Sequence, residues 1–186
     1  MSNYSKHVAV IGAGIAGLAL GCVLKKEGIN VVIFEKNETT SNHGAGISIS
    51  ENGINILKKI GIYEKVLAES ANPKKVSFFS KNKLINSFDV NVITASRKVL
   101  YKCLLDLYSS LDGEIIFAHG IEKLDIYRSE ISFLNGTTHK VMHIAACDGI
   151  KSICREALDP IKNLIIAVIL FGELFIKKVK IPFRLH

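Results

Sequence analysis

The sequence has no tryptophan, only three prolines among its 186 residues, and no dense stripe of lysine and arginine. It also lacks zinc-finger cysteine spacing and the aromatic signature of RNA-binding domains, so we expect no nucleic-acid partner. The formal net charge is +7. More than half of that excess lies in residues 161–186, which carry five basic residues and one acidic residue. The rest of the chain is therefore only mildly basic.

Cysteine is scarce and unclustered. The four cysteines form no C-x-x-C motif, and none lies at a metal-like spacing from a histidine. His139 and His143 have no third ligand near them in the sequence, so we expect no metal site. Free thiols indicate a reducing compartment. The polar start MSNYSK is not a signal peptide, and we expect a cytoplasmic protein.

The first thirty-four residues predict a strand, a helix and a second strand. His7–Ile11 is an apolar run that ends at a glycine, and residues 15–22 then repeat apolar side chains at helical spacing until Gly28. Asn30–Phe34 is a second run rich in β-branched residues. This order predicts a βαβ unit with parallel strands and a right-handed crossover.

The following residues predict further elements of an α/β protein. Val76–Phe79 and Leu84–Phe88 predict a β-hairpin, and Ser96 is a good N-cap for a helix that ends near Ser110. Residues 53–67 read as helical turns broken at Gly61. Four more strands are expected, with a turn at Asn135-Gly136: Glu114–Ala118, Ile121–Tyr127, Glu130–Leu134 and Lys140–Ala146.

A glycine-rich motif, G-x-G-x-x-G, lies between the first predicted strand and helix, at residues 12–17. The first glycine permits a tight turn, the second lets a pyrophosphate approach the backbone, and the third allows close packing of helix and strand. The free N–H groups at the helix start favour bound phosphates. A glycine turn that only solves a packing problem is the alternative interpretation.

Glu35 strengthens the prediction of a dinucleotide site. It ends the second strand 18 residues after Gly17, close to the offset of about 20 residues at which an acid binds a ribose diol. Its carboxylate would repel a 2′-phosphate, so FAD or NAD is favoured. The alternative is a solvated glutamate at a strand end.

A second polar segment follows the last predicted strand. Asp148-Gly149 enters a turn, and a helix with Arg155 near its start comes next. Taken alone, this segment is more typical of an Asp-Gly turn that caps a helix.

Together these motifs resemble the flavin-dependent aromatic hydroxylases of the para-hydroxybenzoate hydroxylase type. The resemblance covers residues 7–158 and rests on five segments in the family's order: Gly12-x-Gly14-x-x-Gly17, Glu35-Lys36, Gly44-Ala45-Gly46-Ile47, Arg97, and Asp148-Gly149-x-x-Ser152-x-x-Arg155. It implies a Rossmann-like FAD/NAD(P)-binding domain with a central parallel sheet and an additional antiparallel β-meander.

The family assigns a role to each of these segments. The glycines and the acid hold the ADP half of FAD, the Gly-Ala-Gly-Ile segment lies near the flavin, the arginine contacts the cofactor, and the Asp-Gly motif serves FAD and NAD(P)H. The resemblance therefore implies cofactor binding by fourteen residues: Gly12, Ala13, Gly14, Ile15, Ala16, Gly17, Glu35, Lys36, Gly46, Ile47, Arg97, Asp148, Gly149 and Arg155.

The implied function is that of a flavoprotein monooxygenase, in which NAD(P)H reduces FAD and O₂ serves to hydroxylate a small aromatic substrate. That chemistry belongs to the cofactor and demands no acid, base or nucleophile of this chain, so no catalytic residue is expected. Two alternatives stay open: a non-catalytic dinucleotide-binding remnant, and a dehydrogenase fragment that binds NAD. The Arg97 and Asp148 segments disfavour the second.

The sequence departs from the family in its third fingerprint and in residues 161–186, which do not resemble the family's continuation. It contains no Gly-Asp dipeptide, which is the family's third fingerprint and binds the ribityl chain of FAD. We therefore expect residues 1–160 to form an incomplete FAD-binding domain, followed by an apolar and then basic tail at 161–186.

The apolar run of that tail, Leu164–Ile176, has thirteen residues, too few for the roughly 20 of a membrane-spanning helix. Contact with an anionic membrane surface is one possibility. A strand or helix that covers the sheet and a tail of altered reading frame are the preferred alternatives.

Overall fold

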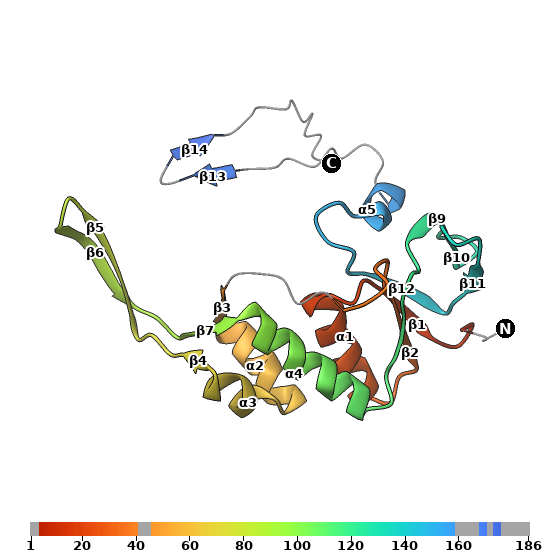
Figure 1. Ribbon diagram of the computed structural model, residues 1–186, viewed down its shortest axis with the longest axis horizontal. Helices are drawn as coiled ribbons and strands as arrows, with labels where there is room; N and C mark the ends of the chain where they lie inside the picture. The colour runs from red at the N-terminus through yellow and green to blue at the C-terminus, as the bar shows by residue number, and fades with distance from the viewer. Residues whose placement is uncertain (1–3, 41–45, 159–167, 171–172, 176–186) are drawn as a thin grey trace, which may run out of the picture.

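A computed structural model describes residues 4–40, 46–158, 168–170 and 173–175 (Figure 1). Its helices and strands follow in chain order: β1 (Val8–Ile11), α1 (Ile15–Lys26), β2 (Val31–Phe34), β3 (Gly46–Ser50), α2 (Glu51–Ile60), α3 (Tyr63–Ala68), β4 (Ser70–Ala71), β5 (Lys75–Ser80), β6 (Lys83–Asp89), β7 (Val92–Ser96), α4 (Arg97–Ser110), β8 (Glu114–Ile116), β9 (Ile121–Asp125), β10 (Glu130–Phe133), β11 (Thr138–Lys140), β12 (His143–Ala146), α5 (Ile153–Leu158), β13 (Val168–Leu170) and β14 (Glu173–Phe175). Among the described helices, none is both long and apolar enough to cross a membrane.

The central sheet is parallel and has the strand order β12-β1-β2-β8. The predicted βαβ unit is confirmed, because β1 and β2 pair in parallel and α1 connects them. All four residues of β2 are buried, which is typical of a strand covered on both faces. This arrangement places the residues that follow β1, β2 and β12 at one edge of the sheet.

Two apolar clusters cover the faces of this sheet. On one face α1 and α4 pack side by side (Figure 1), with Leu18, Cys22 and Tyr108 fully buried between them and the strands. On the other face Phe34 and Phe133 meet in a second cluster, beneath the antiparallel meander β9-β10-β11. The predicted combination of a parallel sheet and an antiparallel meander is therefore confirmed.

The predicted strands Lys140–Ala146 and Glu114–Ala118 differ from the strands observed. Lys140–Ala146 is divided into β11 and β12, because β11 pairs with β10 in the meander and β12 pairs with β1 in the central sheet. The chain changes sheets at Met142, whose N–H donates to the carbonyl of His7 at 2.9 Å. The strand from Glu114 stops at Ile116, and Ala118 has a positive φ of 54°.

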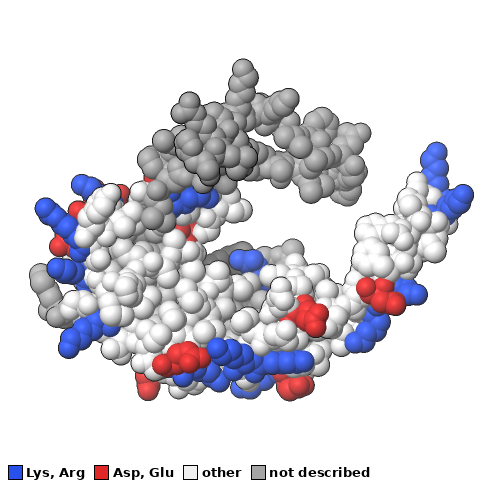
Figure 2. Space-filling model, turned by 180° about the vertical axis from the view of Figure 1, so that it is seen from behind, with Lys and Arg blue, Asp and Glu red and all other residues white. Residues whose placement is uncertain are grey.

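The predicted hairpin is confirmed as β5–β6, and it projects from the body as an arm (residues 75–89; Figure 1). Figure 2 shows this arm with uncharged side chains along its shaft and lysines at its outer end. Its large apolar side chains are between 47% and 67% exposed: Phe78, Phe79, Leu84, Ile85 and Phe88. Exposed apolar surface that is gathered in this way is typical of a packing surface.

Candidate binding site

A cavity of about 570 Å³ lies at the edge of the central sheet where β1, β2 and β12 end. Open α/β sheets bind ligands at this edge, beyond the carboxyl ends of the strands. Ten of the fourteen predicted residues line the cavity: Gly12, Gly14, Ile15, Ala16, Glu35, Lys36, Ile47, Arg97, Asp148 and Gly149. The structure thus brings together segments that are more than one hundred residues apart in the sequence.

The remaining four predicted residues lie outside the lining. Ala13 is buried beneath the turn, and Gly17 packs within the helix start. Gly46 begins β3, while Arg155 turns its guanidinium back to the carbonyl of Ile150 at 3.1 Å. Gly44 and Ala45, which share the motif of Gly46, lie outside the described residues.

The three glycines of the motif occupy different environments. Gly12 has a φ of +100°, and a Cβ there would come within 2.6 Å of the carbonyl oxygen of Cys147. A Cβ on Gly17 would overlap the carbonyl oxygen of Gly12, whereas a Cβ on Gly14 would meet no atom within 4 Å. Close packing therefore requires Gly12 and Gly17, and Gly14 leaves open space beside the cavity.

The amino end of α1 faces this open space without a cap. Gly14 is the N-cap residue, no side chain accepts a hydrogen bond there, and the first turn has no acidic residue. No side chain of α1 itself neutralises the partial positive charge of the helix end, and an anion is favoured there. The acid close to it is Glu35, which accepts a hydrogen bond from the N–H of Ala13 in the preceding turn.

Glu35 is buried, with 9% of its surface exposed, so the alternative of a solvated glutamate is wrong. Its Oε2 accepts a hydrogen bond from the N–H of Ala13 at 2.7 Å. Its Oε1 accepts two from Asn37, from the backbone N–H at 3.0 Å and from Nδ2 at 2.7 Å. The carboxylate therefore ties the end of β2 to the glycine turn.

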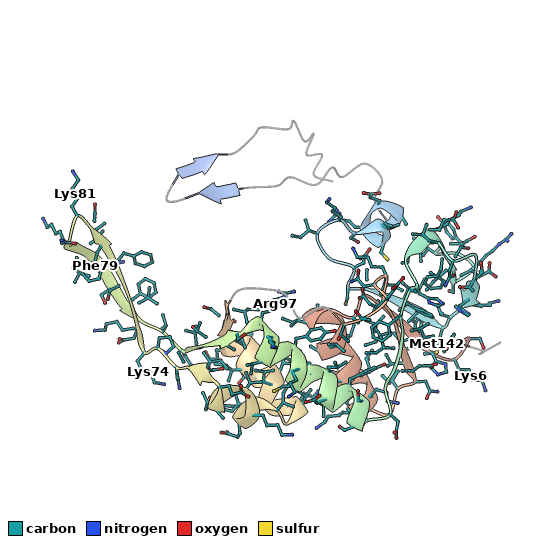
Figure 3. All side chains as sticks on the ribbon, viewed as in Figure 1. Lys6, Lys74, Phe79, Lys81, Arg97 and Met142 are labelled. Carbon is teal, nitrogen blue, oxygen red and sulfur yellow. The ribbon has the colours of Figure 1, made fainter. Side chains whose placement is uncertain are left out.

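Three cationic side chains line the cavity: Lys36, Arg97 and Lys151. In the described part of the chain the two ion pairs join Lys59 to Glu27 and Arg128 to Asp125, so none of the three is paired with an acid. Arg97 lies at the start of α4 (Figure 3), where Ser96 provides the predicted N-cap by accepting from Lys98 N–H at 3.3 Å. The cavity thus offers free positive charge to an anion.

Asp148 uses its carboxylate within its own segment. Oδ1 accepts from the hydroxyl of Ser152 at 2.7 Å, and Oδ2 accepts from the N–H of Cys154 at 3.2 Å. Burial tends to raise the pKa of Asp148, but these hydrogen bonds outweigh burial and hold the pKa below its usual range. These hydrogen bonds are the ones expected for an Asp-Gly turn that caps a helix, which was the alternative interpretation of this segment. Asp148 and Gly149 also line the cavity.

Half of the lining was not predicted from the sequence. His119 and Gly120 between β8 and β9, and Leu134 after β10, form one wall, and Asn37 and Lys151 add polar groups. The wall is fastened to the end of β2, since the N–H of His119 donates to the carbonyl of Glu35 at 2.8 Å. No local pattern marks these residues, because their position follows from the packing of the meander on β2.

An aromatic cluster supports this wall from behind. The ring of His139 stacks on Phe34 with centroids 5.5 Å apart and on His119 with centroids 6.0 Å apart. Burial lowers the pKa of His139, and the neighbouring His119 lowers it further. The folded chain therefore favours neutral His139 more strongly than the unfolded chain does.

This cluster predicts a loss of stability in acid. The unfolded chain binds a proton at His139 near the ordinary histidine pKa of about 6.5, and the folded chain binds it only at lower pH. The stabilising contribution of neutral His139 should therefore be complete above about pH 6.5, and the free energy of unfolding should fall as the pH drops below that value. Urea unfolding at pH 7.5 and 5.5 measures the effect. In His139→Phe the free energy of unfolding should fall less between pH 7.5 and pH 5.5 than in the wild type. His143→Phe, which replaces an exposed histidine, should show the wild-type fall. An equal fall in the two variants contradicts this prediction.

Comparisons with known proteins show the family of this chain. The model of a family described as FAD binding domain matches residues 5–164. The FAD-dependent monooxygenase pytG of Aspergillus terreus is 28% identical over 166 residues, which are 82% of this chain and 50% of pytG. The 6-hydroxynicotinate 3-monooxygenase of Pseudomonas fluorescens is 25% identical over 172 residues, 84% of this chain and 44% of that enzyme.

Solved structures share the fold. A crystal structure of 2-methyl-3-hydroxypyridine-5-carboxylic acid oxygenase superposes with a TM-score of 0.77 at 24% identity, over 83% of this chain and 42% of the oxygenase. The chain therefore spans half or less of the length of the relatives described here.

Proposed function

Since this chain belongs to the FAD binding domain family, we propose that the cavity beyond β1, β2 and β12 holds FAD. The observation that carries the proposal is the open space at Gly14, at the start of α1, beside Lys36, Arg97 and Lys151, which pair with no acid in the described part of the chain. A diphosphate there would accept hydrogen bonds from the backbone N–H groups of the turn and from the cationic side chain of Arg97. Glu35 would accept from a ribose hydroxyl.

The residues present fit the adenosine diphosphate half of FAD. We assign cofactor contacts to the predicted residues that line the cavity, and supporting roles to Ala13 and Gly17 beneath the turn. Gly46 and Arg155 stay predictions, because neither lines the cavity. Lys151, which was not predicted, joins the cationic side chains that would contact the diphosphate.

For a protein that joins this chain to the remaining part of its relatives' length, we propose the activity of a monooxygenase that hydroxylates a small aromatic molecule. Bound FAD would accept electrons from NAD(P)H and use O₂ for this hydroxylation. The names of the relatives, which include 6-hydroxynicotinate and a hydroxypyridine carboxylic acid, support the substrate class. The free thiols of all four cysteines support a reducing compartment such as the cytoplasm.

A dinucleotide-binding module without turnover is the second candidate. It is favoured by the exposed arm, which no other segment covers among the described residues. Consumption of NAD(P)H together with chromatography of a phenolic substrate distinguishes the two candidates. Hydroxylated product indicates the enzyme, and FAD binding without product indicates the module.

The proposal predicts that FAD binds more tightly than NAD. We expect at least a tenfold difference, or about 1.4 kcal/mol, because the resemblance assigns the Arg97 and Asp148 segments to a flavoprotein. NADP should bind more weakly than NAD, since Glu35 would repel a 2′-phosphate. Competitive titration against the flavin fluorescence of FAD measures all three affinities. Tight binding of NAD without binding of FAD would replace this proposal with the dehydrogenase fragment.

A further inference from the structure

Glu35 and Asn37 form a local hydrogen-bond network at the rim of the cavity. Asn37 follows β2 by three residues and donates twice to Oε1 of Glu35, from its backbone N–H and from Nδ2. Its own carbonyl accepts from the N–H of Ala118 at 2.9 Å. Asn37 is thus fixed to the wall on one side and to the carboxylate on the other.

The acceptor sites of this carboxylate are nearly filled. An ionised carboxylate offers about four lone-pair sites, and the protein occupies three of them, two on Oε1 and one on Oε2. The remaining site is on Oε2, the oxygen that also accepts from Ala13 N–H. Glu35 lines the cavity, so this site is the one available to a ligand.

We propose that Asn37 is a positioning residue of the dinucleotide site. Its amide holds Oε1, so that Oε2 keeps Ala13 in place and presents a single acceptor to one ribose hydroxyl. The terminal torsion of a glutamate is soft, and without Nδ2 only the backbone N–H groups of Ala13 and Asn37 restrain it. This inference rests on the proposed FAD site.

The test measures FAD affinity by calorimetry for Asn37→Ala, Glu35→Gln and the double variant. We expect Asn37→Ala to weaken binding three- to tenfold. In the Glu35→Gln background the same change should cost less than twofold, because Asn37 acts through Glu35. Asn86→Ala is the matched control: the same truncation at an exposed asparagine of β6, outside the cavity lining, whose Oδ1 accepts from its neighbour Ser87 N–H at 2.8 Å.

A second variant, Asn37→Asp, keeps the shape and adds a charge. At pH 8 its carboxylate would repel Glu35, and FAD should bind more weakly than to the wild type. Toward pH 5.5 one proton shared by the two carboxylates would restore a hydrogen bond, so the deficit relative to wild type at the same pH should shrink. A merely structural role of Asn37 predicts no such recovery.

The outcomes separate the inference from the proposal beneath it. A wild-type chain that binds no FAD overturns both. If the wild-type chain binds FAD, two results overturn only the role of Asn37. One is an FAD affinity of Asn37→Ala equal to that of wild type, and the other is an affinity loss of the double variant equal to the product of the two single losses. A pH-independent deficit of Asn37→Asp also overturns that role.

Discussion

Gly17→Ala should unfold the chain or bring it close to unfolding. The new Cβ would overlap the carbonyl oxygen of Gly12, and Val10 Cγ1 closes the other side at 3.3 Å. Gly12 cannot move away, because its N–H donates to the carbonyl of Phe34 at 2.7 Å and the backbone of Cys147 lies 2.6 Å from where a Cβ of Gly12 would be. We expect the free energy of unfolding to fall by at least about 3 kcal/mol, as for a large steric change in a core. Urea unfolding monitored by circular dichroism measures the loss.

Gly14→Ala is the matched control, with the same methyl group three residues earlier. A Cβ at Gly14 meets nothing within 4 Å, so the stability should change by less than about 1 kcal/mol. The methyl would occupy the space through which a diphosphate approaches the start of α1, so FAD should bind at least tenfold more weakly. Stability of Gly17→Ala like that of wild type would contradict the packing argument. FAD affinity of Gly14→Ala like that of wild type would place the phosphates elsewhere.

Features with a local cause could be predicted from the sequence. The βαβ unit follows from two apolar runs around a glycine turn, and α2 ends at Ile60, directly before Gly61 with its φ of 82°, as that glycine indicated. The hairpin follows from the two strand-like runs Val76–Phe79 and Leu84–Phe88, and one turn of the meander follows from Asn135-Gly136. Glu35 was predicted as a site residue because the spacing of the βαβ unit determines where the second strand ends.

Features that depend on packing between distant segments could not be predicted. The wall of His119, Gly120 and Leu134 exists because the meander packs on Phe34, and no local pattern encodes that contact. The division between β11 and β12 has the same cause, since Thr138–Lys140 pairs with β10 and His143–Ala146 pairs with β1. Asn37 was missed because a polar residue after a strand is ordinary until its partner is known.

Removal of the Glu35 carboxylate should affect both folding and binding. In Glu35→Ala three N–H donors lose their acceptor: Ala13 N–H, Asn37 N–H and Asn37 Nδ2. Because Glu35 is buried, water replaces these bonds only in part, and the free energy of unfolding should fall by about 1–3 kcal/mol.

The same variant should bind FAD about ten- to a hundredfold more weakly, since a hydrogen bond to a charged acceptor contributes about 1.5–3 kcal/mol. Calorimetry at a temperature at which the variant is fully folded separates this loss from the loss of stability. Glu122→Ala, an exposed glutamate on β9 outside the cavity lining, is the control and should match wild type in both measurements. If Glu35→Ala leaves the dissociation constant for FAD unchanged, Glu35 does not contact the ligand. Its role is then structural: its carboxylate holds Ala13 to the end of β2.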